Sequence, residues 1–159
     1  MNFKNSILII AGEPNSVFLE IFFKTIKKTN IKKPLILIAS HKLIKLQMTK
    51  LKFKKKIKLI NNKNYFNLNL DNKSINLLDV KYNPKKAFES ISKNSNKYIQ
   101  NCFDLAFKII KKYKIKRVIT GPISKKTFLN KKYLGLTEYI SKKFNVKKSA
   151  MLIYNKKLS

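Results

Sequence analysis

The stretch Arg117-Val118-Ile119-Thr120-Gly121-Pro122 has the pattern of a strand that stops abruptly at a turn. A short apolar run bounded by turn residues predicts a strand, and proline lacks the backbone N–H that would continue the sheet ladder. The chain has only 3 glycines in 159 residues. Each should mark a position where the backbone takes positive φ or where another group comes close. Since α/β enzymes hold ligands at the ends of such strands, we expect Gly121 to border a ligand-binding turn.

On both sides of this stretch, apolar runs alternate with helical periodicity. Strands are expected at residues 6–11, 35–39, 57–60, 75–80, 115–120 and 149–154, and helices over about 42–52, 84–113 and 137–144, with a short helix near Ser124. Residues 61–73 have the composition of a polar loop. This alternation predicts an α/β fold, in which a mainly parallel sheet is flanked by helices.

Two of the expected helices have a definite apolar face. Asn15 or Ser16 should cap the first helix, whose buried face is predicted to hold five residues: Val17, Phe18, Ile21, Phe22 and Ile26. The stripe of the helix over 84–113 is Ile99, Cys102, Phe103, Ala106, Ile109 or Ile110, and Tyr113. Because Cys102 falls on this stripe, it is interpreted as a buried structural thiol rather than a nucleophile.

The net charge of +30 comes from 37 basic residues, all of them lysine except Arg117. Such a charge is compatible with nucleic-acid binding. However, the lysines are scattered along nearly every segment, and base readers generally use arginine forks. We therefore favour a solvated lysine surface without dedicated nucleic-acid binding. No apolar run approaches the length of a membrane span, and a single cysteine fits a reducing compartment, so we expect a cytoplasmic location and no membrane partner.

Three short motifs follow one another in the chain: Ala-Gly-Glu-Pro at 11–14, Thr-Gly-Pro-Ile-Ser-Lys at 120–125, and Gly-Leu-Thr-Glu-Tyr at 135–139. An apolar Ala-Met-Leu-Ile run occupies 150–153. In order and separation this pattern resembles that of the 4-hydroxythreonine-4-phosphate dehydrogenases of vitamin B6 biosynthesis. The likeness covers the whole chain but only about the first half of a family member.

The resemblance implies an isocitrate/isopropylmalate dehydrogenase-like fold that is truncated here, with a first domain at residues 1–134 and the start of a second at 135–159. It also implies NAD(P)-dependent, metal-assisted oxidation of 4-phosphohydroxy-L-threonine by a homodimer. The family's metal-binding histidines are expected beyond Ser159, so this chain should hold no metal site and should be inactive alone. The cofactor, NAD or NADP, is bound in this family without the glycine-rich dinucleotide fingerprint, which the chain lacks.

The resemblance further implies that Lys125, Leu136 and Thr137 contact the substrate, with Gly12, Gly121 and Gly135 as the turn glycines of the site. Leu136 stands where the family has histidine, which removes an imidazole from the substrate side. The catalytic residues and the cofactor-binding residues are not assigned.

Most of these side chains also have a plain structural explanation. Lys125 is either a phosphate or carboxylate ligand or a solvated lysine, and Thr137 either contacts substrate or caps a helix. Glu138 is expected to complement a helix dipole. Glu13 faces a ligand or pairs with a lysine of a neighbouring loop.

His41 has no second histidine with which to share a metal, and a lone histidine is most often structural or exposed. The alternative to the enzyme hypothesis is a non-enzymatic remnant or a lysine-rich nucleic-acid-binding domain.

Overall fold

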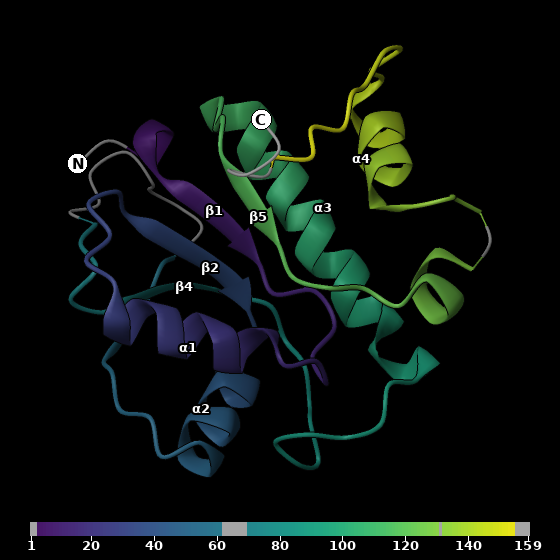
Figure 1. Cartoon of the computed structure of the whole chain (residues 1–159). Coiled ribbons are helices and arrows are strands. Elements are labelled where there is room, and N and C mark those ends of the chain that lie inside the picture. Colours follow the sequence, from purple (N-terminus) through teal and green to yellow (C-terminus); the bar gives the residue numbers. More distant parts are fainter. Residues whose placement is uncertain (1–2, 62–69, 131, 155–159) are drawn as a thin grey trace. The chain divides into compact units, whose positions relative to one another are not determined.

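Five short strands form the sheet of this protein. They are β1 (Ile7–Ile10), β2 (Leu35–Ala39), β3 (Ile57–Leu59), β4 (Ile75–Asp79) and β5 (Val118–Thr120), in the order β3-β4-β2-β1-β5. All four pairings between neighbours are parallel. The computed structural model describes residues 3–61, 70–130 and 132–154. It confirms the predicted α/β class with a parallel sheet and flanking helices (Figure 1).

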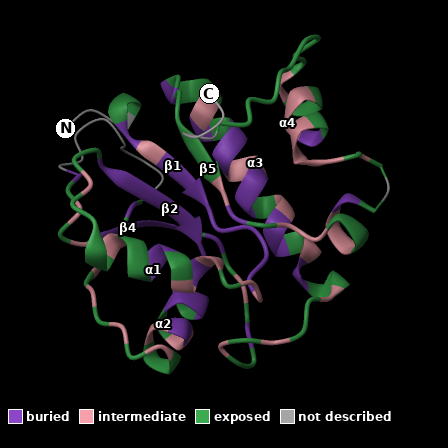
Figure 2. Cartoon of the chain, viewed as in Figure 1, coloured by how far each residue is buried: buried purple, intermediate pink, exposed green. Residues whose placement is uncertain are grey.

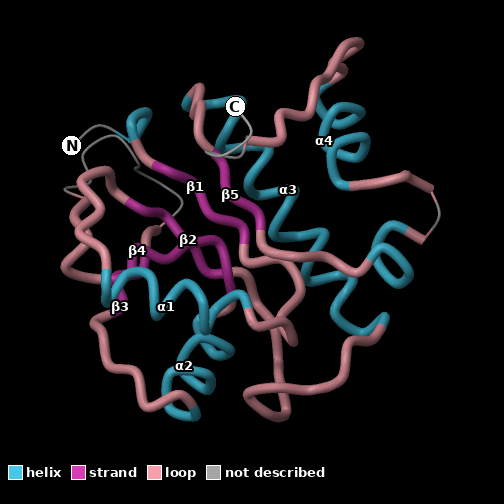
Figure 3. The backbone as a smooth tube through the Cα atoms, in the orientation of Figure 1, coloured by secondary structure: helices cyan, strands magenta, loops and turns pink. Residues whose placement is uncertain are grey.

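The register places the carboxyl ends of the central strands at one edge. Ile10 lies opposite Ile38 on β2 and opposite Thr120 on β5, and Ala39 lies opposite Asp79 on β4. Because parallel strands all run the same way, the loops that follow them gather at this edge of the sheet. The tube in Figure 3 shows these loops leaving the strands on the same side.

Helices cover both faces of the sheet. One buried cluster joins α1 (Phe18–Lys28) and α2 (His41–Lys50) to the strands through residues such as Phe22, Ile44 and Leu37. The alternate strand residues face the other way, where α3 (Asn96–Tyr113) packs against β1 and β2. All five residues of β2 are buried, as expected of a central strand with both faces covered. In Figure 2 β2 and most of β1 are buried, whereas β5 is largely exposed.

The predicted buried face of α1 is partly wrong. Val17 is 61% exposed and Ile21 is 55% exposed, whereas Leu19, Phe22 and Phe23 are buried. The helix begins at Phe18, so Val17 precedes it. The residues that meet the sheet are spaced by three and four from Leu19, which is the spacing of one helical face.

The long helix begins later than expected, at Asn96 rather than near Pro84. The segment before it is held in turns: the Glu89 carboxylate accepts hydrogen bonds from the backbone N–H groups of Lys85 and Lys86. A short helical turn, Lys93–Ser95, then leads into α3. The predicted stripe is confirmed, because Ile99, Cys102, Phe103, Ala106, Ile109 and Tyr113 are all buried.

A second compact unit, Ser124–Ser159, follows the first, Met1–Ile123. It contains the turn Lys125–Leu129 and helix α4 (Leu136–Phe144). The strand expected at 149–154 is wrong: these residues have no regular structure, and Leu152 is 89% exposed. Within the described residues no strand pairs with them, so their backbone finds no ladder to join. The domain boundary expected between residues 134 and 135 stays a prediction.

The polar loop expected at 61–73 falls largely outside the described residues. None of the described helices is both long and apolar enough to cross a membrane.

Candidate functional site

The loops after β1 and β5 cross in direct backbone contact. The Gly121 N–H donates to the Ile10 carbonyl at 2.7 Å, and the Glu13 N–H donates to the Pro122 carbonyl at 2.9 Å. These two hydrogen bonds extend the backbone contact between β1 and β5 beyond the ends of both strands. We call this contact, formed by residues 11–13 and 121–122, the glycine crossing.

Glycine is required at both central positions of the glycine crossing. A Cβ atom at Gly121 would overlap the Ala11 carbonyl, and one at Gly12 would overlap the carbonyl of Pro122. Gly12 also has φ of +72°, which side chains disfavour. The sequence prediction that these glycines mark close approach therefore has a structural basis, although the approaching group is backbone. That a ligand also borders them stays a prediction.

Gly135 is different from the other two glycines. It has an extended backbone and occupies the N-cap position of α4. A Cβ atom there would lie 3.0 Å from the Glu138 carboxylate, which is the movable end of a side chain. The expectation that nothing larger than glycine fits therefore does not extend to this turn.

Glu13 connects the glycine crossing to the start of α3. Its carboxylate accepts hydrogen bonds from the Ser95 hydroxyl at 3.0 Å and from the Asn15 N–H at 3.3 Å. The residue is only 2% exposed. Burial raises the pKa of its carboxyl, and the two hydrogen bonds oppose that rise. No lysine of the described part of the chain pairs with Glu13, so the alternative of a lysine partner is wrong.

Ser40 organises the carboxyl end of β2. Its hydroxyl accepts from the Leu43 N–H, which caps α2, and donates to the Tyr82 carbonyl, both at 3.3 Å. Its N–H donates to the hydroxyl of Tyr98 at 3.1 Å. Complete burial raises the pKa of Tyr98 well above its usual value, so this phenol stays neutral. Sequence reasoning missed this network because its members are 58 residues apart.

His41 lies beside this network, at the first position of α2. Its N–H donates to the Asp79 carboxylate at 2.8 Å. Ser40, His41 and Asp79 line a hollow of about 330 Å³ with Lys42, Lys81, Tyr82 and Asn83. Among the described residues no group of three or more histidine, cysteine or carboxylate side chains could hold a metal ion.

The expected substrate-facing residues belong to the second compact unit. Lys125 is exposed and opens the turn Lys125–Leu129, which the Ser124 hydroxyl caps by accepting from the Thr127 N–H at 3.2 Å. Leu136 and Thr137 are the first two residues of α4 and are half-buried. The N-cap of α4 is Gly135, so the capping role considered for Thr137 is wrong. Glu138 lies in the first turn of α4, as expected.

An aromatic cluster joins the two elements that carry these residues. The Tyr139 ring meets the Phe128 ring edge-on at 5.7 Å and the Tyr133 ring at 5.2 Å. Lys125 and Thr137 are thus held on neighbouring elements of one unit. The glycine crossing belongs to the other unit, and the expected convergence of Gly121 with Lys125 and Thr137 stays a prediction.

Cys102 is fully buried on α3. Burial raises the pKa of its thiol to about 12, which keeps it protonated and unreactive near neutral pH. The interpretation as a structural thiol is therefore confirmed.

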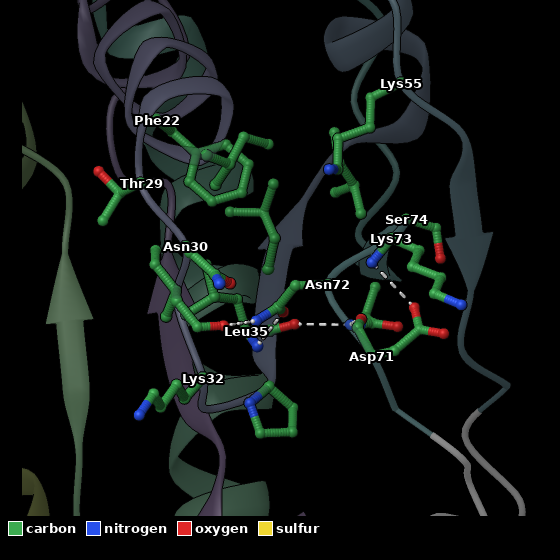
Figure 4. Close-up of a pocket in the computed structure, with 16 residues that line it drawn as sticks. Phe22, Thr29, Asn30, Lys32, Leu35, Lys55, Asp71, Asn72, Lys73 and Ser74 are labelled. Carbon is green, nitrogen blue, oxygen red and sulfur yellow. Dashed lines mark hydrogen bonds between the residues drawn. The ribbon is translucent and has the colours of Figure 1, made fainter.

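A hollow of about 450 Å³ lies near the amino end of β2, between α1 and the residues that precede β4 (Figure 4). The Asn72 side chain bridges it: its amide donates to the Ile31 and Lys33 carbonyls, and its oxygen accepts from the Leu35 N–H at 2.9 Å. All of these bonds tie one chain segment to another. We assign this hollow a structural role, because ligands of parallel sheets bind at the carboxyl ends of the strands.

Comparison of this chain with known protein families and solved structures identifies a family match. The family model described as "Pyridoxal phosphate biosynthetic protein PdxA" matches residues 30–159. The fold is similar to that of a 4-hydroxythreonine-4-phosphate dehydrogenase from Burkholderia phymatum, with 19% identity and a TM-score of 0.75 over 92% of this chain and 46% of that chain. It is also similar to the Klebsiella pneumoniae enzyme of the same name, with 14% identity and a TM-score of 0.75 over 89% of this chain and 45% of that chain. The chain therefore spans about half the length of these solved structures. Curated protein sequences gave no significant match.

Proposed function

Since the chain belongs to the PdxA family, we propose that it forms part of an enzyme that oxidises 4-phosphohydroxy-L-threonine in pyridoxal phosphate biosynthesis. The observation that carries the proposal is the family match over residues 30–159. It spans both of the motifs expected to face the substrate, 120–125 and 135–139. The two solved relatives, named as 4-hydroxythreonine-4-phosphate dehydrogenases, support the same assignment.

In this proposal Lys125 binds the anionic end of the substrate. Its side chain is exposed, and the turn that carries it is only five residues long. The ammonium charge, rather than a helix N-terminus, therefore provides the attraction. A charge-assisted hydrogen bond of this kind contributes about 1.5 to 3 kcal/mol.

Thr137 and Leu136 form the second part of the proposed substrate surface. The Thr137 hydroxyl can both donate to and accept from a polar substrate. Leu136 offers only an apolar side chain where the family has histidine. We infer that this position contributes contact but no hydrogen bond, so substrate binding through this surface is weaker than an imidazole would give.

NAD or NADP would supply the hydride acceptor for such an oxidation. The glycine crossing does not provide a cradle for the cofactor, because the space in front of its glycines is filled by backbone. Nor do the described residues form a ligand set for a divalent metal. We propose that the metal ligands lie outside the described residues. The residues that bind NAD or NADP are not assigned. A cytoplasmic location and assembly as a homodimer are proposed on the family alone.

The proposed substrate surface can be tested by NMR titration of the ¹⁵N-labelled chain with 4-phosphohydroxy-L-threonine. We expect the amide signals of Lys125, Leu136 and Thr137 to shift. Lys125→Ala should weaken binding by about tenfold or more, as expected for loss of a charged hydrogen bond. The matched control is Lys126→Ala, an exposed neighbour on the same turn, which should leave the affinity within about twofold. Equal losses in the two variants, or shifts confined to other segments, would refute the assignment.

A second variant tests the departure from the family pattern. Leu136→His should tighten substrate binding by about threefold or more, because a neutral hydrogen bond contributes roughly 1 kcal/mol.

The 159-residue chain mixed with substrate, NAD or NADP, and Mg²⁺, Mn²⁺ or Zn²⁺ should produce no reduced cofactor, which would absorb at 340 nm. Metal-dependent reduction by this chain would contradict the placement of the metal site.

A further inference from the structure

A lysine-lined groove runs between α2 and the chain segment that follows it. One wall is a stripe of α2 and its end, formed by His41, Lys45, Met48, Thr49 and Lys52. These residues recur at three and four positions and so share one helical face. The other wall is the extended segment 53–59, which leads into and includes β3. The groove has a volume of about 1220 Å³.

The walls of this groove are fixed by backbone and core contacts. After α2 the Phe53 N–H donates to the Met48 carbonyl at 2.9 Å, and the Lys52 N–H donates to the Thr49 carbonyl at 3.2 Å. This is the hydrogen-bond pattern of a Schellman turn. The Phe53 ring stacks on Phe23 of the core, with centroids 4.7 Å apart. Lys45 and Lys52 therefore lie on α2 and its terminal turn, and Lys54, Lys55 and Lys56 lie between the anchored Phe53 and β3.

Five lysines line the groove and no carboxylate does: Lys45, Lys52, Lys54, Lys55 and Lys56. Three other hollows in the described part of the chain each contain an acidic residue, namely Asp71, Asp79 or Glu89. None of the five lysines forms an ion pair within the described residues. Like charges that line one groove repel one another, and a bound polyanion would relieve that repulsion.

The composition of the groove indicates which polyanion it suits. Its basic groups are lysines, which act as point charges without the planar fork that arginine presents. Its rings are those of Phe53, which is stacked on the core, and His41. The groove thus offers little base stacking, which supplies much of the affinity for single-stranded nucleic acid. We propose that this groove binds linear inorganic polyphosphate through charge alone, at a site separate from the proposed substrate surface.

Polyphosphate binding can be measured by fluorescence anisotropy with an end-labelled polyphosphate chain and the 159-residue protein at 150 mM salt. The test variant is Lys45→Gln/Lys54→Gln/Lys56→Gln, which removes three exposed groove lysines. Its matched control is Lys97→Gln/Lys108→Gln/Lys116→Gln, which removes three exposed lysines that line none of the described hollows. Both lose the same charge, and thermal unfolding checks that both remain folded.

The groove variant should lose at least tenfold in affinity, and its logarithmic salt slope should fall by about 2, as counterion release by three lysines predicts. The control should lose less than threefold. Equal losses would show that binding follows net charge and would overturn the proposal, as would the absence of binding by the unaltered chain. A single-stranded RNA homopolymer of equal charge that bound more tightly through the same lysines would make the groove a nucleic-acid site and would also overturn it.

Discussion

The glycine crossing and the ends of the helices place opposite demands on the backbone. At the helix ends, Lys52, Lys114, Asn130 and Asn145 all have positive φ, in a region where glycine is the common residue. At the crossing, Gly121 does not need positive φ, yet the Ala11 carbonyl leaves no space for a side chain. This chain thus tolerates left-handed lysine and asparagine and keeps glycine where two backbones touch. Lack of space alone explains Gly121, whereas lack of space and positive φ together explain Gly12.

The largest expected effect is that of Gly121→Ala, because its Cβ would overlap the Ala11 carbonyl group and the Phe18 ring. We expect it to lower the free energy of unfolding by about 3 kcal/mol or more, measured by urea denaturation. Gly12→Ala should be comparably destabilising, because it adds strain from positive φ. A decrease of less than about 1 kcal/mol in the free energy of unfolding of both variants would mean that the backbone of the glycine crossing shifts to admit a Cβ atom at little cost.

A pH-dependent effect is expected at Glu13. Its pKa in the folded protein is raised above the ordinary value of 4.5, so the folded state holds the proton more tightly than the unfolded state. The resulting stabilisation is complete below the unfolded pKa and is lost as pH rises through the folded pKa. Compared with Glu13→Gln, the unaltered chain should therefore lose stability as pH rises above 4.5. Parallel stability profiles for the two proteins would show that burial of this carboxyl has no energetic consequence.

A smaller effect of opposite sign is expected at the helix ends. Lys52→Gly and Lys114→Gly should each raise the free energy of unfolding by about 0.5 to 1 kcal/mol. Glycine removes the strain of a left-handed side-chain residue, and this gain exceeds its cost in unfolded-chain entropy. If both variants were destabilised instead, the lysine side chains would be contributing contacts that outweigh the strain.

The smallest effect should come from Gly135→Ala. This glycine has an extended backbone, and the added Cβ would meet only the movable carboxylate of Glu138. We expect the free energy of unfolding to change by less than about 0.5 kcal/mol. A loss as large as that of Gly121→Ala would erase the distinction between the two kinds of glycine.

Local patterns predicted much of this fold. The apolar run of β2 and the stripe of α3 follow directly from residue periodicity, and both are buried as expected. Scarcity of glycine identified Gly12 and Gly121 as positions of close approach. The pattern could not say what approaches, because the contact joins loops that are far apart in the sequence.

Other features depend on contacts that periodicity does not encode. The start of α3 is set by turns around Glu89 and by Ser95, whose bond to Glu13 spans 82 residues. The apolar run at 149–154 resembles a strand, but a strand forms only where a neighbour accepts its hydrogen bonds. Threonine is a common N-cap residue, which made Thr137 a candidate for the cap of α4. The N-cap is instead Gly135, two residues earlier.

From its two backbone hydrogen bonds we infer that the glycine crossing is a rigid extension of the sheet beyond its strands. Amide hydrogen exchange followed by NMR tests this directly, because Gly121 and Glu13 donate the two crossing hydrogen bonds. We predict that their amides exchange as slowly as that of Ile10 in β1, and that Gly121→Ala makes the Glu13 amide exchange at least tenfold faster relative to Ile10. Exchange of both amides at the rate of an exposed loop in the unaltered chain would contradict the claim.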